Sequence, residues 1–108
     1  MLQHVVLFSF PEDLSVEDER SLFGQVRRWP ESIGGIEAIR IGRSINEERT
    51  RGYQYLLYME LADLEALVRY QRHAVHQDFL RWVLDRSCTP LAFDYYLDTE
   101  TVVHPPGA

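Results

Sequence analysis

The sequence predicts an α+β fold in which strands and helices follow one another as β-α-β-β-α-β, the ferredoxin-like arrangement. Three observations support this prediction. Four short segments, at residues 3–10, 36–43, 53–60 and 91–97, are rich in β-branched and aromatic residues, as strands are. Two longer segments between them repeat apolar residues with the helical period. Glycine or proline stands near most of the joins, where turns are expected.

The first half of the chain is expected to begin with a strand and a helix. Residues 3–10 run up to Pro11 and are mostly apolar on both faces, which is typical of a strand covered on both sides. Ser15 can cap a helix that runs to about Trp29. Pro30 is expected to end this helix, because proline has no N–H and disfavours helical geometry in the residue before it. The buried face of the helix would hold Leu22, Phe23, Val26 and Trp29.

The rest of the chain holds the other predicted elements. A turn at Gly34–Gly35 leads into the strand at 36–43, and the polar residues 44–51 form an exposed loop before the strand at 53–60. Asp63 can cap a second helical region, whose apolar pattern continues to Val83. Because no glycine or proline interrupts this region, the sequence leaves open whether it is one helix or two that break near His73. The last strand follows Pro90.

Composition limits the classes of function. The 108 residues form one predicted domain, residues 1–98, and a loose tail, residues 99–108. A net charge of −6, with arginine as the only basic residue besides histidine, argues against a nucleic-acid partner. No apolar run is long enough to span a bilayer, and no signal peptide is apparent at the start. The single cysteine, Cys88, fits a reducing cytoplasm, which is the predicted location.

The fold leaves one face of the sheet without a cover, because two helical regions can cover only one face of four strands. An apolar face left in water favours association, so a second copy of the sheet is the expected cover. The sequence therefore predicts a homodimer formed by sheet-to-sheet packing. The residues expected on the uncovered face are Val5, Leu7, Ile39, Ile41, Leu56 and Tyr58.

Tyr70, His73 and His76 are the candidate functional residues within the second helical region. They are spaced three apart, so in a continuous helix they lie along one slowly drifting row. A tyrosine and an imidazole beside an apolar stripe can form a proton-transfer site. On the residues alone, the more ordinary interpretation is favoured: amphipathic side chains at the edge of a core, with their polar tips hydrogen-bonded.

Several motifs, taken together and in this order, resemble the stress-responsive A/B barrel domain family over about residues 3–97. The family resemblance implies a dimeric α+β barrel, in which the sheets of two copies face each other, and a small cavity between sheet and helices in each copy. The motifs are His4-Val5-Val6-Leu7-Phe8, Pro30 with Gly34-Gly35-Ile36, Ile41-Gly42-Arg43, Arg51-Gly52-Tyr53, Asp63-Leu64-Glu65-Ala66-Leu67, Tyr70 with His73 and His76, and Asp94-Tyr95.

Within this family, the chain is similar to plant polyketide cyclases of the olivetolic acid cyclase type. In those enzymes a tyrosine and a histidine promote aldol ring closure without metal or cofactor, and Tyr70 and His76 stand at the matching positions. His4 and Asp94 match as well. The chain departs from the pattern twice. It has His73-Ala74-Val75-His76 where the family often has His-Pro-x-His, and Tyr55 stands where the plant cyclase has a pocket histidine.

Three hypotheses about function follow. In the first, a cofactor-independent enzyme, His76 is the general base, Tyr70 donates a hydrogen bond to the forming oxyanion, and Asp94 holds the ring of His76 in one tautomer. The binding residues would be His4, Tyr55 and His73, and the ligand a small hydrophobic or polyketide-like molecule. In the second, a non-catalytic stress-responsive protein uses the same cavity to bind a ligand. The third, metal binding through His73 and His76, is disfavoured because no cysteine or third histidine is close in sequence.

Overall fold

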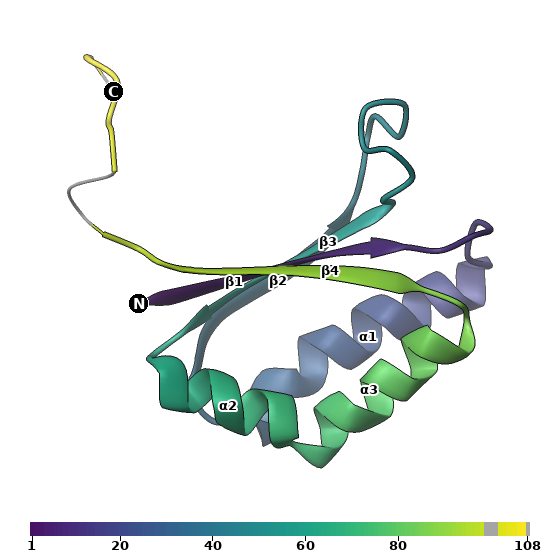
Figure 1. The fold of residues 1–108 in the computed structure, drawn as a ribbon, viewed down its shortest axis with the longest axis horizontal. Coiled ribbons are helices and arrows are strands. Elements are labelled where there is room, and N and C mark those ends of the chain that lie inside the picture. Colours follow the sequence, from purple (N-terminus) through teal and green to yellow (C-terminus); the bar gives the residue numbers. More distant parts are fainter. Residues whose placement is uncertain (99–101, 108) are drawn as a thin grey trace.

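The computed structural model of the chain describes residues 1–98 and 102–107. It contains a four-stranded antiparallel sheet with three helices on one of its faces (Figure 1). This is the predicted ferredoxin-like α+β fold. In chain order the elements are β1 Leu2–Ser9, α1 Val16–Ser32, β2 Ile36–Arg43, β3 Tyr55–Leu61, α2 Leu64–Arg72, α3 Ala74–Asp85 and β4 Thr89–Tyr96.

The strands lie in the order β2-β3-β1-β4, so the first and third strands form the centre of the sheet. In the ladders His4 lies opposite Met59 of β3 on one side and opposite Asp94 of β4 on the other. Because side chains alternate along a strand, this register places all three on the face covered by the helices. The core is packed between that face and the helices, and its largest fully buried side chains include Trp29 and Tyr70.

The predicted helix starts are confirmed, and each has a local cause. The Ser15 hydroxyl accepts a hydrogen bond from the Asp18 N–H at 3.1 Å. The Asp63 carboxylate does the same for the Ala66 N–H at 2.8 Å. Each bond satisfies a donor that has no partner within the first turn of its helix.

The prediction that Pro30 ends the first helix is wrong, since α1 continues to Ser32. Near the C-terminus of a helix, proline removes a single backbone hydrogen bond. The turn is held in place by burial on both sides of Pro30, because Trp29 and Ile33 are almost fully buried. The Ile33 N–H also donates to the Trp29 carbonyl at 2.8 Å, which closes the last turn.

The predicted turn at Gly34–Gly35 is confirmed, and Gly35 is required there for two reasons. Its φ of +89° lies in the left-handed region, which residues with a Cβ rarely adopt. In addition, a Cβ at this position would lie 2.7 Å from the Cβ of Ala66. The turn therefore allows the start of β2 to pass closely over α2.

The second helical region, which the sequence left open, is two helices that break at His73. This residue has an extended backbone (φ −64°, ψ 138°) and ends α2 while it caps α3. Its ring Nδ1 accepts a hydrogen bond from the Val75 N–H at 3.1 Å. The break thus depends on a side-chain cap and not on glycine or proline.

Ile39 and Ile41 lie on the helix-covered face, contrary to the prediction. They pair with Met59 and Leu57 of β3, which are buried against the helices. The physical reason is a β-bulge between Ile36 and Ala38, which shifts the alternation of β2 by one residue. The register therefore places other side chains on the uncovered face, among them Val5, Leu7, Leu56, Tyr58, Leu91, Phe93 and Tyr95.

Two strand boundaries differ by about two residues from those predicted. The third strand begins at Tyr55 rather than Tyr53, and the last begins at Thr89, so Pro90 lies inside β4. Proline is tolerated there because β4 is an edge strand. Residues 102–107 form no helix or strand, whereas residues 99–101 and 108 of the predicted tail lie outside the described residues. In the described part of the chain, no helix has the length and apolarity needed to cross a membrane.

Candidate functional site

A cavity of about 180 Å³ lies between the sheet and the helices. Its walls are mostly apolar, and the lining includes four ring side chains that carry nitrogen or oxygen, from four different elements. These are His4 of β1, Trp29 of α1, Tyr70 of α2 and His76 of α3. Apolar walls with a few polar groups are typical of small-molecule sites.

Tyr70 and His76 are neighbours in this cavity, with ring centroids 4.3 Å apart. Tyr70 lies in the last turn of α2 and His76 in the first turn of α3. The break at His73 therefore sets the position of each ring relative to the other. Tyr70 is buried and His76 is half-buried, so both rings are held by packing.

One nitrogen of His76 is occupied by the backbone. Its Nδ1 lies 3.2 Å from the carbonyl oxygen of Gln71, which can only accept a hydrogen bond. Nδ1 therefore carries the proton in the neutral ring, and Nε2 is left with a lone pair. Burial lowers the pKa of His76, the Gln71 carbonyl partly opposes this, and the nearby His4 adds to the lowering. A neutral imidazole with a free Nε2 can act as a base.

Asp94 is bonded to His4 and not to His76, so the predicted contact is corrected. The His4 Nδ1 and the Asp94 carboxylate form a hydrogen bond across the β1–β4 ladder, where the two residues lie directly opposite each other. The strand register explains this pairing, because it brings the carboxylate to a histidine of the adjacent strand. The tautomer of His76 is set by Gln71 instead.

His4 connects this pair to Tyr70. The rings of His4 and Tyr70 meet edge to face, with centroids 5.3 Å apart. Burial raises the pKa of Tyr70 well above its ordinary value of 10.0, and the charge of Asp94 raises it further. Tyr70 is therefore a neutral hydroxyl at physiological pH, suited to donate a hydrogen bond rather than to act as a phenolate.

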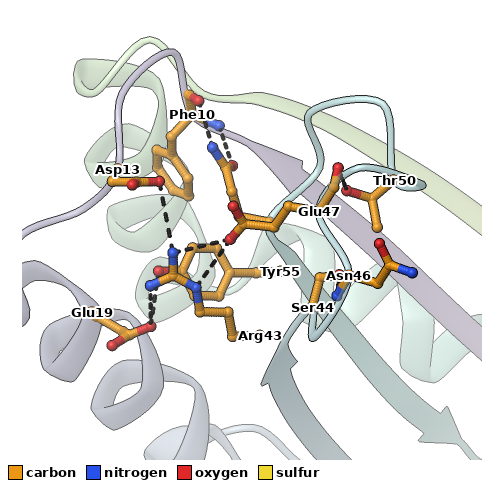
Figure 2. Close-up of polar contacts among 10 residues, drawn as sticks. Phe10, Asp13, Glu19, Arg43, Ser44, Asn46, Glu47, Thr50 and Tyr55 are labelled. Atoms are coloured by element: carbon orange, nitrogen blue, oxygen red, sulfur yellow. Dashed lines mark hydrogen bonds and ion pairs between the residues drawn. The ribbon is translucent and has the colours of Figure 1, made fainter.

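Tyr55 does not line the cavity, although it was predicted to bind ligand. Figure 2 shows its ring beside Arg43 and Glu19, and its hydroxyl donates to the Glu19 carboxylate at 3.0 Å. Burial and this hydrogen bond raise the pKa of Tyr55 to about 12. Tyr55 lies on the same face of β3 as Leu57 and Met59, but it contacts Glu19 near the start of α1, whereas the cavity is near the end of that helix. The alternation of a strand predicts which face a side chain is on, but not which part of a helix it meets.

His73 is likewise absent from the cavity wall. Its ring caps α3 through the Val75 N–H, as described above. The equal spacing of Tyr70, His73 and His76 placed the three in one row of a continuous helix. The break turns His73 away from that row, so its observed contact is structural.

Trp29 and Gln71 complete the site, and sequence analysis did not identify either as functional. Trp29 was assigned only to the buried face of its helix, and Gln71 contributes a backbone carbonyl that no sequence pattern reports. The indole N–H of Trp29 is the notable group: it is buried, and it has no hydrogen-bond acceptor among the residues that the structure describes.

Other features of the surface offer fewer side chains that could act as acids, bases or metal ligands. A more open depression of about 430 Å³ lies beside the loop after β2, and no histidine or carboxylate lines it. Among residues 1–98 and 102–107, no group of three or more histidine, cysteine or carboxylate side chains is arranged to hold a metal ion.

Comparison with known proteins gives a family and a set of similar folds. Residues 2–97 match the family model of the stress responsive A/B barrel domain. No curated protein matches the sequence.

Three solved structures illustrate the similar folds. A protein of Arabidopsis thaliana is 23% identical, with a TM-score of 0.81 over 94% of this chain and 100% of that one. A dimeric protein of ferredoxin-like fold from Bacteroides fragilis is 23% identical, with a TM-score of 0.75 over 89% of this chain and 95% of that one. Hydroxynitrile lyase from Passiflora edulis is 10% identical, with a TM-score of 0.79 over 96% of each chain. At these identities the likeness concerns the fold.

Proposed function

Since the chain belongs to the stress-responsive A/B barrel domain family, we propose that it is a homodimeric enzyme that closes rings in small, largely apolar carbonyl compounds. The reaction is an aldol addition of the kind that polyketide cyclases perform, and it needs no cofactor. The observation that carries this proposal is the Tyr70–His76 pair, whose ring centroids lie 4.3 Å apart on the wall of one cavity.

The chemistry assigns each group a step. The free Nε2 of His76 removes a proton from a carbon next to a carbonyl group, and the electron pair of that C–H bond forms an enolate. The Tyr70 hydroxyl donates a hydrogen bond to the enolate oxygen, which lowers the barrier because it meets charge as it develops. The enolate carbon then attacks a second carbonyl carbon of the same molecule. The resulting alkoxide takes the proton back from the His76 imidazolium, so the enzyme is restored.

His4 and Asp94 act as positioning residues in this proposal. The Asp94 carboxylate holds the His4 ring, and the edge-to-face contact between the His4 and Tyr70 rings positions Tyr70. The buried His4 side chain needs a hydrogen-bond partner, and the partly exposed Asp94 carboxylate supplies it. The pair therefore gives Tyr70 a rigid neighbour within the sheet.

The homodimer is proposed because of the uncovered face of the sheet. Phe93 exposes 67% of its surface, Leu91 50% and Leu56 43% on a face that no helix covers. The similar protein from Bacteroides fragilis is described as dimeric. We propose that a second copy of this chain packs its sheet against this face.

One observation favours a second candidate, the non-catalytic ligand-binding protein. Tyr55, which stands where plant cyclases have a pocket histidine, lies outside the cavity. The site therefore holds fewer polar groups than the cyclase pattern, and a cavity of this kind can bind a ligand without converting it.

Linear poly-β-keto thioesters of increasing length provide the test. The cyclised product has the same mass as its linear substrate, so it is separated by liquid chromatography before detection by mass spectrometry. We expect wild-type protein to accelerate ring closure, and His76→Ala to lower the rate by about 10²-fold, the usual contribution of a positioned base. Tyr70→Phe should lower turnover with the fold intact, because it removes one hydroxyl. His104→Ala is the control, since His104 is exposed and distant from the cavity in sequence.

The outcomes separate the two candidates. Binding of the thioesters without cyclisation would favour the ligand-binding protein. Cyclisation that His76→Ala leaves unchanged would remove the assigned mechanism.

A further inference from the structure

The side chain of Trp29 has an unusual position for a core residue. It is 1% exposed, yet it lines the cavity together with Tyr70 and His76. Its indole lies 4.8 Å from the Phe79 ring, 5.5 Å from the Tyr70 ring and 5.9 Å from the His76 ring, measured between centroids. Three rings therefore lie close to the indole.

The indole N–H is a donor that cannot accept, and in the described part of the chain it meets no acceptor. A buried donor without a partner costs about 1–3 kcal/mol. Phenylalanine would fill much of the same space without this cost. Within residues 1–98 and 102–107, no other side-chain nitrogen or oxygen is both fully buried and unpaired. The unpaired group thus belongs to a side chain that lines the cavity to which the Tyr70–His76 pair is assigned.

We propose that the Trp29 indole N–H donates a hydrogen bond to an oxygen of the bound ligand. This inference rests on the proposed function and narrows its substrate class. Tyr70 supplies one donor, and Trp29 supplies a second from a different helix. A ligand that uses both is an apolar molecule with at least two acceptor oxygens, such as a 1,3-dicarbonyl compound, and Trp29 orients the oxygen that does not become the enolate.

The test uses acetophenone and ethylbenzene, which have similar shapes and differ in one carbonyl oxygen. Both are of a size suited to the cavity, since apolar cavities of about 150 Å³ admit benzene. The measurement is the indole N–H signal in two-dimensional proton–nitrogen NMR. Only Trp29 and Trp82 give such signals, so the half-buried Trp82 serves as an internal reference. The spectra are recorded in wild type and in Tyr70→Phe, where the tyrosine no longer competes for the carbonyl.

We expect acetophenone to shift the Trp29 indole proton downfield in Tyr70→Phe, while ethylbenzene binds without that shift. The Trp82 signal should move with neither compound. In Trp29→Phe, acetophenone should bind about 3- to 10-fold more weakly, the range expected for one net hydrogen bond, and ethylbenzene should bind within twofold of its wild-type affinity.

Three results would overturn the inference. The first is acetophenone binding with no shift of the Trp29 signal. The second is an equal loss of binding affinity for both compounds in Trp29→Phe, which would mean that the indole only fills space. The third is an indole proton already shifted upfield in the free protein and unmoved by acetophenone, which would mean that an aromatic ring accepts the N–H. Failure of both compounds to bind at millimolar concentration would overturn the proposed function as well, so the two failures are distinguishable.

Discussion

Single side chains in the cavity are held in their neutral forms by burial. Desolvation disfavours a charge on either Tyr70 or His76: it lowers the pKa of His76 and raises that of Tyr70. Both shifts keep the histidine a base and the tyrosine a donor at neutral pH. Hydrogen bonds then decide orientation, since the Gln71 carbonyl occupies one nitrogen of His76.

The lowered pKa of His76 predicts a dependence of stability on pH. In the unfolded chain, His76 takes up a proton as the pH falls through its ordinary value of 6.5, whereas in the folded protein it does so only at lower pH. The unfolded state therefore binds more protons between the two pKa values, and stability falls as the pH falls through that window. Above pH 6.5, His76 is neutral in both states and contributes no pH dependence.

Urea denaturation of wild type and His76→Gln at pH 7.5 and 5.5 measures this effect. The free energy of unfolding should fall further between the two pH values in wild type, because glutamine does not titrate. Other titrating groups are common to both proteins and cancel in the comparison. Equal falls would contradict the burial of a neutral His76.

At the scale of elements, the site depends on where one helix ends and the next begins. Tyr70 closes α2 and His76 opens α3, and His73 lies between them with its ring on the Val75 N–H. In a single straight helix, the positions of these two rings would be set by the helical period alone. The break sets the position of each ring relative to the other, and the His73 cap stabilises the break.

Loss of this cap should destabilise the protein. His73→Ala is expected to lower the free energy of unfolding by about 0.5–2 kcal/mol, the range found for N-cap residues. His73→Asn is the matched variant and should restore most of the loss, because asparagine is a preferred N-cap. The measurement is chemical denaturation of the three proteins. Wild-type stability of His73→Ala, or an equal loss in His73→Asn, would argue against a capping role.

At the scale of the whole molecule, the structure has two layers and leaves one side of the sheet open. All three helices cover the same face (Figure 1). The opposite face exposes aromatic and aliphatic side chains of β3 and β4, such as Leu56 and Phe93. An apolar face of this extent favours contact with another apolar surface, and a second copy offers a self-complementary one.

The proposed dimer predicts a clear effect of charge on this face. Wild type at micromolar concentration should sediment with twice the mass of the chain. Leu7→Arg or Leu56→Glu should shift the protein toward monomer, because each places a charge in a desolvated interface. Leu84→Arg is the control, since Leu84 is an exposed leucine on α3, away from the sheet. A monomeric wild type, or an equal effect of Leu84→Arg, would contradict the proposal.

The sequence by itself determined the order of the elements, the N-caps of α1 and α2 and the glycine turn before β2. These features depend on local chemistry: the period of apolar residues, the hydroxyl of Ser15, the carboxylate of Asp63 and the backbone freedom of Gly35. Helical spacing grouped Tyr70, His73 and His76 in one row, and the family resemblance singled out Tyr70 and His76. The structure brings these two rings together in one cavity.

Only the tertiary structure decided which groups meet across the chain. Asp94 bonds to His4 because the strand register places them opposite each other, and no local pattern contains that register. A one-residue bulge turned Ile39 and Ile41 toward the helices, and burial of its neighbours carried α1 past Pro30. Likewise, the cavity that Trp29 lines exists only once four elements pack together. Local propensities set each element, whereas partners and cavities result from the packing of elements that are distant in sequence.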